Sequence, residues 1–340
     1  MKIKKLHIEN YKVFRDFSID FTNNGEVQNL IVLAGINGSG KSTLLCDVMK
    51  TCMNNINQKK YTEISPNVYQ MGSFTIETTE NHNFSIVMDT LDDEEKDIKL
   101  AKEVILKYID KLIFENNLRS SEAYEKTNEL LNEIFHHFNL HIDFHGIDRN
   151  REVIFRNGGD DVKIENLSNG ERMLITRTFS LFLGEYKNSV ILIDEPESSL
   201  HPTWQSRITS IYQRFANENN NQIIMSTHSP HILASVKKEQ IRLLAKDDNG
   251  NIVAYDNFLG AYGWRVDKIL TEILGLENLR APEVEEKLNK LNSLLQKNKY
   301  DTTEFDSLYQ ELENDLGFAD TDLILIRLEK QRKEQQKNKK

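Results

Sequence analysis

The stretch NLIVLAGINGSGKS, residues 29–42, decides the fold of this chain. Its first part, Asn29–Ala34, is a continuous apolar run, which is typical of a strand covered on both faces. Its second part, Gly35–Ser42, fits the pattern G-x-x-x-x-G-K-[ST], and a helix is expected from about Lys41 to Asn54. A glycine-rich loop between a strand and a helix predicts a phosphate-binding loop.

Each part of this loop has an expected role. The glycines let backbone N–H groups curl around phosphate oxygens, and the positive end of the following helix faces the anion. Lys41 would contact the β- and γ-phosphates of ATP, and Ser42 would ligate Mg²⁺. The predicted nucleotide-binding residues of the loop are Asn37, Gly38, Ser39, Gly40, Lys41, Ser42 and Thr43.

A second buried strand ends in two carboxylates. The run Val190–Ile193 is followed by Asp194, Glu195 and a proline. Asp194 is predicted to hold Mg²⁺ directly or through water. Glu195 is predicted to orient or deprotonate the attacking water, although a surface residue before a turn would look the same in isolation.

The pentapeptide Leu167–Glu171, LSNGE, supports two compatible interpretations. Ser168 and Glu171 match a capping box that opens a helix. A helix N-terminus that carries glycine, here Gly170, is also an anion site. Because a cap orders the backbone that would meet a phosphate, both can hold together.

Two histidines follow the carboxylate strand. His228, in STHSP after the buried run Gln222–Ser226, is predicted to hydrogen-bond a γ-phosphate and act in catalysis with Glu195 and Lys41. A capping or core histidine is the plainer alternative. His201, in Ser199-Leu200-His201, fits a dimer contact and a local turn equally well.

Buried strands that alternate with helices predict an α/β fold with a largely parallel sheet. Period-two patterns predict strands over Lys4–Phe21 and a hairpin over Gly72–Thr90, turning at residues 80–83. We expect an ATPase lobe over 1–90, an insertion of helices and short strands over 91–166, a second lobe over 167–245 and a helical region over 246–340. The sequence 247–250, DDNG, predicts a hairpin turn.

Composition limits the class of protein. The 340 residues carry a formal net charge of −10, which argues against a surface dominated by nucleic-acid contacts. The exception is the basic tail from Arg327 to Lys340, for which a solvated helix end is preferred over a DNA contact. No apolar run is long enough for a membrane span and no signal segment is evident, so a cytoplasmic protein is expected. The two cysteines, Cys46 and Cys52, cannot form a disulfide framework or a four-ligand zinc site.

These segments, in this order, resemble the ABC-type ATPases of the RecF and SMC-like group. Gly35–Ser42 matches Walker A, Leu167–Glu171 the ABC signature, Val190–Glu195 Walker B, Ser199–His201 the D-loop and His228 the switch histidine. The resemblance implies an ABC-ATPase head, a P-loop NTPase fold with a mixed or parallel sheet, a short helical insertion and a helical C-terminal region. It also implies a head-to-tail homodimer in which ATP on Lys41 of one copy meets Ser168 and Gly170 of the other.

The opening residues 6–14, LHIENYKVF, also look like the first strand of that group, which implies that Lys12 lies close to the nucleotide. The insertion is far too short for the long coiled coils of SMC proteins. Gln70 is the candidate for the Q-loop glutamine of the family. No acidic cluster for a Toprim nuclease is evident, so no intrinsic nuclease site is identified.

The C-terminal sequence resembles the PtuA family of the Septu anti-phage systems. The similarity is carried by residues 262–270, YGWRVDKIL, and 280–284, RAPEV, followed by a helical pair. It implies an ATPase that regulates a separate HNH nuclease in defence against phage. The alternatives are a RecF-like repair ATPase that clamps DNA directly, a transporter motor, an ATP-locked scaffold with negligible turnover, or helices that merely pack on the chain's own sheet.

Overall fold

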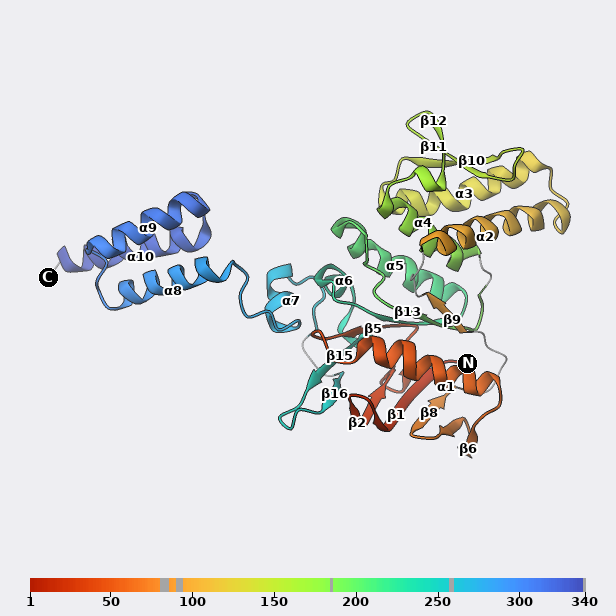
Figure 1. Cartoon of the computed structure of the whole chain (residues 1–340), viewed down its shortest axis with the longest axis horizontal. Coiled ribbons are helices and arrows are strands. Elements are labelled where there is room, and N and C mark those ends of the chain that lie inside the picture. The colour runs from red at the N-terminus through yellow and green to blue at the C-terminus, as the bar shows by residue number, and fades with distance from the viewer. Residues whose placement is uncertain (80–85, 90–93, 184–185, 257–259, 339–340) are drawn as a thin grey trace. The chain divides into compact units, whose positions relative to one another are not determined.

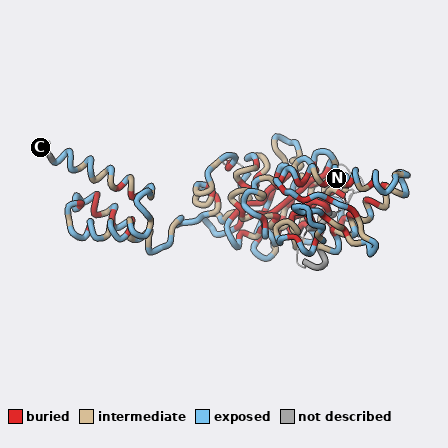
Figure 2. Tube along the Cα trace, turned by 90° about the horizontal axis from the view of Figure 1, so that it is seen from above, coloured by how far each residue is buried: buried red, intermediate tan, exposed pale blue. Residues whose placement is uncertain are grey.

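The computed structural model describes residues 1–79, 86–89, 94–183, 186–256 and 260–338. The chain divides into two compact units, Met1–Gly275 and Leu276–Lys340. Buried residues gather inside each unit (Figure 2). Among the described helices, none combines the length and apolar character that crossing a membrane requires.

A six-stranded sheet forms the centre of the first unit (Figure 1). The apolar run at residues 30–34 is one of its middle strands, and its neighbours pair with it in parallel register. The edge pair β15–β16 is antiparallel, and it is joined by the turn expected at residues 247–250. In spatial order the strands are β16 (Ile252–Tyr255), β15 (Ile241–Lys246), β5 (Leu30–Ala34), β14 (Gln222–Ser226), β13 (Val190–Ile193) and β9 (Ile86–Asp89).

Both faces of this sheet are buried, as the continuous apolar runs predicted. In β5, Leu30 and Val32 belong to one hydrophobic core while Ile31 and Leu33 belong to the other. Successive side chains of a strand point to opposite faces, so one unbroken apolar run serves two cores. The core on one face includes helix α5 (Pro202–Glu218), and the core on the other includes α1 (Lys50–Asn57) (Figure 1).

The second core lies between this sheet and an antiparallel five-stranded sheet. Its strands, in spatial order, are β2 (Phe14–Asp20), β1 (Ile3–Tyr11), β8 (Phe74–Thr78), β7 (Val68–Met71) and β6 (Thr62–Ser65). A two-stranded ribbon joins β3 (Thr22–Asn23) to β4 (Glu26–Val27). The prediction of a hairpin over Gly72–Thr90 is wrong. β8 pairs with β1 and β7, whereas β9 pairs in parallel with β13 in the other sheet. The expected turn lies outside the described residues.

The helix after the phosphate loop begins with an irregular turn. Residues Thr43–Met49 are in π-helical conformation, and the α-helical part, α1, continues to Asn57. Its apolar side is buried in the second core, with Cys52 among the buried residues. Expectation and structure therefore agree on a helix here and differ in its first turns.

The middle of the chain contains helices and short strands. Two long helices are followed by an antiparallel three-stranded sheet and by the helix that the LSNGE sequence opens. These elements are α2 (Glu94–Phe114), α3 (Ser120–Phe138), β10 (Ile142–Ile147), β11 (Val153–Asn157), β12 (Asp160–Lys163) and α4 (Asn169–Leu183). The unit ends with α6 (Pro230–Ser235) and α7 (Val266–Glu272).

The second unit is a bundle of α8 (Pro282–Gln296), α9 (Thr303–Leu316) and α10 (Thr321–Asn338). Leucines of these helices pack on one another, since Leu288, Leu291, Leu295 and Leu312 share a core of their own. Four basic residues of α10 are paired with acids of the same unit, and Lys333 donates to the Asn298 side chain. The ion pairs of α10 include Lys330–Asp306, Lys337–Asp301, Arg327–Glu313 and Arg332–Glu329.

A buried glutamine ties β1 to the central sheet. The Gln222 Oε1 atom accepts a hydrogen bond from the Ile3 N–H at 2.7 Å, and its Nε2 atom donates to the carbonyls of Ile3 at 2.9 Å and Gln28 at 3.4 Å. Gln222 is completely buried. Loss of the Gln222 amide would therefore leave backbone groups in the interior without a hydrogen-bond partner.

We expect Gln222→Leu to lower the free energy of unfolding by about 2–5 kcal/mol, because two buried backbone groups of Ile3 and the half-buried carbonyl of Gln28 lose a partner. Urea unfolding followed by circular dichroism measures the change. Gln58→Leu, at an exposed position after α1, is the control and should stay within about 0.5 kcal/mol of the parent. Equal stability of the two variants would contradict this role for Gln222.

Candidate nucleotide site

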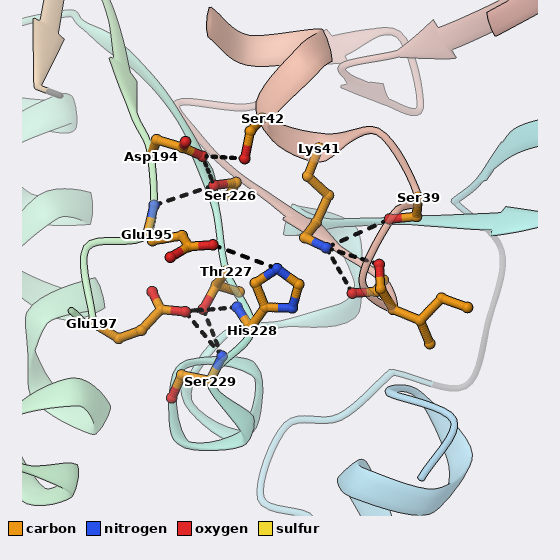
Figure 3. A network of polar contacts seen from close by, with 12 residues as sticks. Ser39, Lys41, Ser42, Asp194, Glu195, Glu197, Ser226, Thr227, His228 and Ser229 are labelled. Atoms are coloured by element: carbon orange, nitrogen blue, oxygen red, sulfur yellow. Dashed lines mark hydrogen bonds and ion pairs between the residues drawn. The ribbon is translucent and has the colours of Figure 1, made fainter. Parts of the chain in front are cut away.

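Three parallel strands deliver the predicted catalytic residues to one edge of the central sheet. β5 leads into the phosphate loop, β13 into Asp194 and Glu195, and β14 into the turn that carries His228. The carboxyl ends of parallel strands lie at the same edge, so groups far apart in the sequence meet there. Figure 3 shows Lys41, Ser42, the two carboxylates and His228 around one space.

Lys41 is folded against its own loop. Its Nζ atom donates to the carbonyls of Gly35 at 2.8 Å and Ile36 at 3.1 Å, and the residue is 4% exposed. Burial lowers the pKa of Lys41 to about 8, although nearby carboxylates, Glu195 foremost, act in the opposite direction. An ammonium group with few competing water molecules is well suited to bind phosphate oxygens.

The loop can curl only because of its glycines. Gly38 and Gly40 have φ values of 78° and 87°, in the left-handed region that favours glycine. At Gly40 a Cβ atom would also lie 2.7 Å from the Cζ atom of Phe14. Any side chain there would push against the β1–β2 hairpin and disturb the loop.

Ser42 and Asp194, the two residues expected to hold Mg²⁺, lie next to each other. The Ser42 Oγ atom lies 3.2 Å from Asp194 Oδ1, which also accepts a hydrogen bond from the Ser226 hydroxyl. On the other side of the carboxylate, Cys46 Sγ lies 3.6 Å from Asp194 Oδ2. Oxygen ligands from a hydroxyl and a carboxylate are the donors that Mg²⁺ prefers, so these residues fit the ion.

Glu195 and His228 face each other. Glu195 Oε1 lies 3.5 Å from His228 Nε2, and the Glu195 backbone has a φ of 48°. This left-handed conformation is held from two sides. The Glu195 N–H donates to Ser226 Oγ at 3.2 Å, and the Glu195 carbonyl accepts from Arg177 of α4 at 3.0 Å.

The LSNGE sequence does form a capping box. The Ser168 N–H donates to Glu171 Oε2 at 2.9 Å, and the Glu171 N–H donates to Ser168 Oγ at 3.4 Å. A Cβ atom at Gly170 would come within 2.9 Å of the Trp204 ring. Ser168 and Asn169 remain exposed, so the start of α4 is open to a ligand from outside the chain.

The remaining candidates have local partners. The Lys12 Nζ atom pairs with Asp47 Oδ2 at 2.5 Å, and its φ of 49° places it in the tight β1–β2 turn. His201 caps α5, since its Nδ1 atom accepts from the Thr203 N–H at 3.3 Å. Gln70 lies in β7, between β6 and β8.

Sequence reasoning missed four residues of this site: Cys46, Arg177, Glu197 and Ser226. Each acts on a predicted residue rather than on a ligand, and no local motif marks such a partner. Only Glu197 carries a sequence signal, as a third acid in the segment DEPE at 194–197. Its carboxylate binds the turn that holds His228.

Two family models match the chain. Residues 1–89 match a model described as "AAA ATPase domain", and residues 110–234 match one described as "AAA domain, putative AbiEii toxin, Type IV TA system". Both matches are to ATPase-type domains, and together the two segments contain all the residues labelled in Figure 3.

The chain is similar to bacterial proteins of the Septu and retron types. It is 32% identical to Septu protein PtuA of Bacillus thuringiensis over 27% of this chain and 24% of that protein. Septu protein PtuA of Bacillus mycoides is 25% identical over 79% of this chain and 44% of that protein. The Retron Vc95 probable ATPase of Vibrio cholerae is 32% identical over 39% of this chain and 28% of that protein. The chain thus spans between a quarter and a half of the length of these relatives.

The fold is that of an SMC head. A crystal structure of the SmcHead bound to the C-winged helix domain of ScpA matches with a TM-score of 0.50 and 17% identity, over 75% of this chain and 98% of that one. The expectation of an ABC-ATPase head with a P-loop and a mixed α/β sheet is therefore confirmed.

We expect Lys41→Ala to weaken ATP binding at least about 100-fold, equivalent to about 3 kcal/mol, because the phosphates lose their buried ammonium partner. Isothermal titration calorimetry with ATP and Mg²⁺ measures this. Lys59→Ala, at an exposed position after α1, is the control and should bind like the parent. Full affinity in Lys41→Ala would show that ATP binds elsewhere.

Proposed function

We propose that this chain, an SMC-like P-loop ATPase related to the Septu PtuA proteins, hydrolyses ATP in a site completed by a second copy and thereby controls a partner nuclease. The observation that carries the hydrolysis is the convergence of Lys41, Ser42, Asp194, Glu195 and His228 at one sheet edge. Together they supply a cation that binds the phosphates, two oxygen atoms that could bind the metal ion, a general base and a hydrogen-bond donor to the γ-phosphate.

Each residue has one task in this proposal. Lys41 moves from the carbonyls of Gly35 and Ile36 to the β- and γ-phosphate oxygens. Ser42 and Asp194 would hold Mg²⁺, which neutralises phosphate charge when bound. Glu195 orients the attacking water and accepts its proton. His228, next to Glu195, donates a hydrogen bond to the γ-phosphate.

The start of α4 supports a shared site. Ser168 is exposed, and its hydroxyl and N–H are ordered by Glu171 of the same helix. This cap holds the helix N-terminus in shape while leaving it accessible from outside. A second copy arranged head to tail would bring this helix N-terminus to the γ-phosphate, where its dipole stabilises the anion.

The role in defence rests on the relatives. Septu and retron proteins are similar to this chain. We therefore propose an anti-phage function with a separate HNH-type nuclease as the partner, in the cytoplasm. The direct DNA clamp gains little from the structure, because basic residues of α10 are already paired with acids.

We expect Glu195→Gln to reduce the rate of ATP hydrolysis by roughly 100-fold or more while ATP still binds, since the amide cannot accept the proton. The ATP-bound dimer should then accumulate, which sedimentation velocity with and without ATP detects. Glu218→Gln, at the C-terminal end of α5, is the control and should turn over ATP normally. Rapid turnover in Glu195→Gln would mean that the base is another residue.

A mixing experiment tests the shared site. Ser168→Arg should bind ATP as a monomer yet be inactive, and Lys41→Ala should be inactive for lack of ATP. A heterodimer of the two contains one site with both halves intact, so the mixture should recover hydrolysis or, if turnover needs both sites, hold one ATP per dimer by native mass spectrometry. A mixture with neither property would contradict a site built from two copies.

A further inference from the structure

Glu197 holds the turn that carries His228. Its Oε1 atom accepts hydrogen bonds from the Thr227 hydroxyl at 2.7 Å, the His228 N–H at 2.6 Å and the Ser229 N–H at 3.1 Å (Figure 3). A single carboxylate oxygen thus binds three consecutive residues. Two of the donors are backbone groups, so Glu197 fixes the path of the main chain and not only a side chain.

The environment of the Glu197 carboxylate is unfavourable for one of its two oxygen atoms. Its Oε2 atom is buried and has no hydrogen-bond partner among the described residues. An unsatisfied buried carboxylate oxygen is unfavourable because it has given up its hydration without gaining a hydrogen bond. Such groups in native structures require an explanation, and function is one of them.

Glu197 also shares a rigid loop with Glu195. The Ser198 N–H donates to the Glu195 carbonyl at 3.1 Å, and the Leu200 N–H donates to the Glu197 carbonyl at 2.9 Å. Arg177 holds the Glu195 carbonyl from α4. One end of this loop therefore carries the proposed base, and its middle carries the clamp on the histidine turn.

We infer that Glu197 is a positioning residue for ATP hydrolysis, which fixes His228 relative to Glu195 through the backbone of residues 227–229. This inference rests on the proposed ATPase function. Glu197 touches neither phosphate nor water in this role. It acts through His228, so removing it should impair the chemical step and leave ATP binding unchanged.

A double-mutant cycle separates this role from general stabilisation. Glu197→Ala should lower kcat by roughly tenfold to 100-fold, the effect of a misplaced catalytic group, with an unchanged Kd for ATP. His228→Ala should also lower kcat. The double variant should be no slower than His228→Ala alone, because Glu197 has nothing left to position. Glu218→Ala is the matched carboxylate control and should keep the parental kcat.

Two conservative variants keep the test independent of folding. Glu197→Gln retains an acceptor for the three donors and should recover most of the lost kcat. Thr227→Val removes one of the three hydrogen bonds at nearly constant volume and should show a smaller loss than Glu197→Ala. Losses that add in the double variant, or parental kcat in Glu197→Ala, would overturn the inference, as would Glu197→Gln being as slow as Glu197→Ala.

A spectroscopic readout distinguishes failure of this inference from failure of the ATPase proposal. If the parent protein hydrolyses no ATP, the proposed function fails and the cycle cannot be read. The ¹³C-labelled histidine ring signals of His228, assigned with His228→Ala, then decide. Glu197→Ala should shift or broaden them, and Glu218→Ala should not. Unchanged His228 signals in Glu197→Ala would overturn the positioning role.

Discussion

The parallel pairing of β5, β14 and β13 is the constraint on which the rest of this structure depends. It sets the phosphate loop, the carboxylate pair and the histidine turn at one edge, in a fixed lateral order with β14 in the middle. Strands with both faces buried cannot slip by one residue without exchanging their two cores. The alternation of Leu30 and Ile31 between these cores therefore also fixes the position of Lys41.

Three unfavourable local conditions occur at this edge. Lys41 is buried next to acids, Glu195 has a left-handed backbone, and Glu197 has a buried oxygen atom with no hydrogen bond from the described part of the chain. Each of these conditions is unfavourable by itself and persists because the surrounding sheet and helices hold it. Arg177 and Ser226 both hold Glu195, one from α4 and one from β14.

The sequence predicted the loop and helix start at this edge better than it predicted the pairing of the strands. Glycines at fixed spacing, an apolar run before them and a Ser-x-x-Glu cap are strong local signals. The phosphate loop and the start of α4 could therefore be predicted from the sequence. The strand partners of β8 and β9 could not be predicted, because each strand looks like half of a hairpin and the choice of partner depends on contacts far along the chain. Glu197 and Arg177 were missed for the same reason, since their partners lie 18 to 32 residues away.

The contacts of Lys41 with its own loop have a consequence for how this protein responds to nucleotide. The carbonyls of Gly35 and Ile36 occupy the ammonium group that phosphate oxygens would otherwise take. A ligand that binds Lys41 must therefore replace these hydrogen bonds to the loop carbonyls. A triphosphate offers more oxygens in exchange for these two carbonyls than a single phosphate group does.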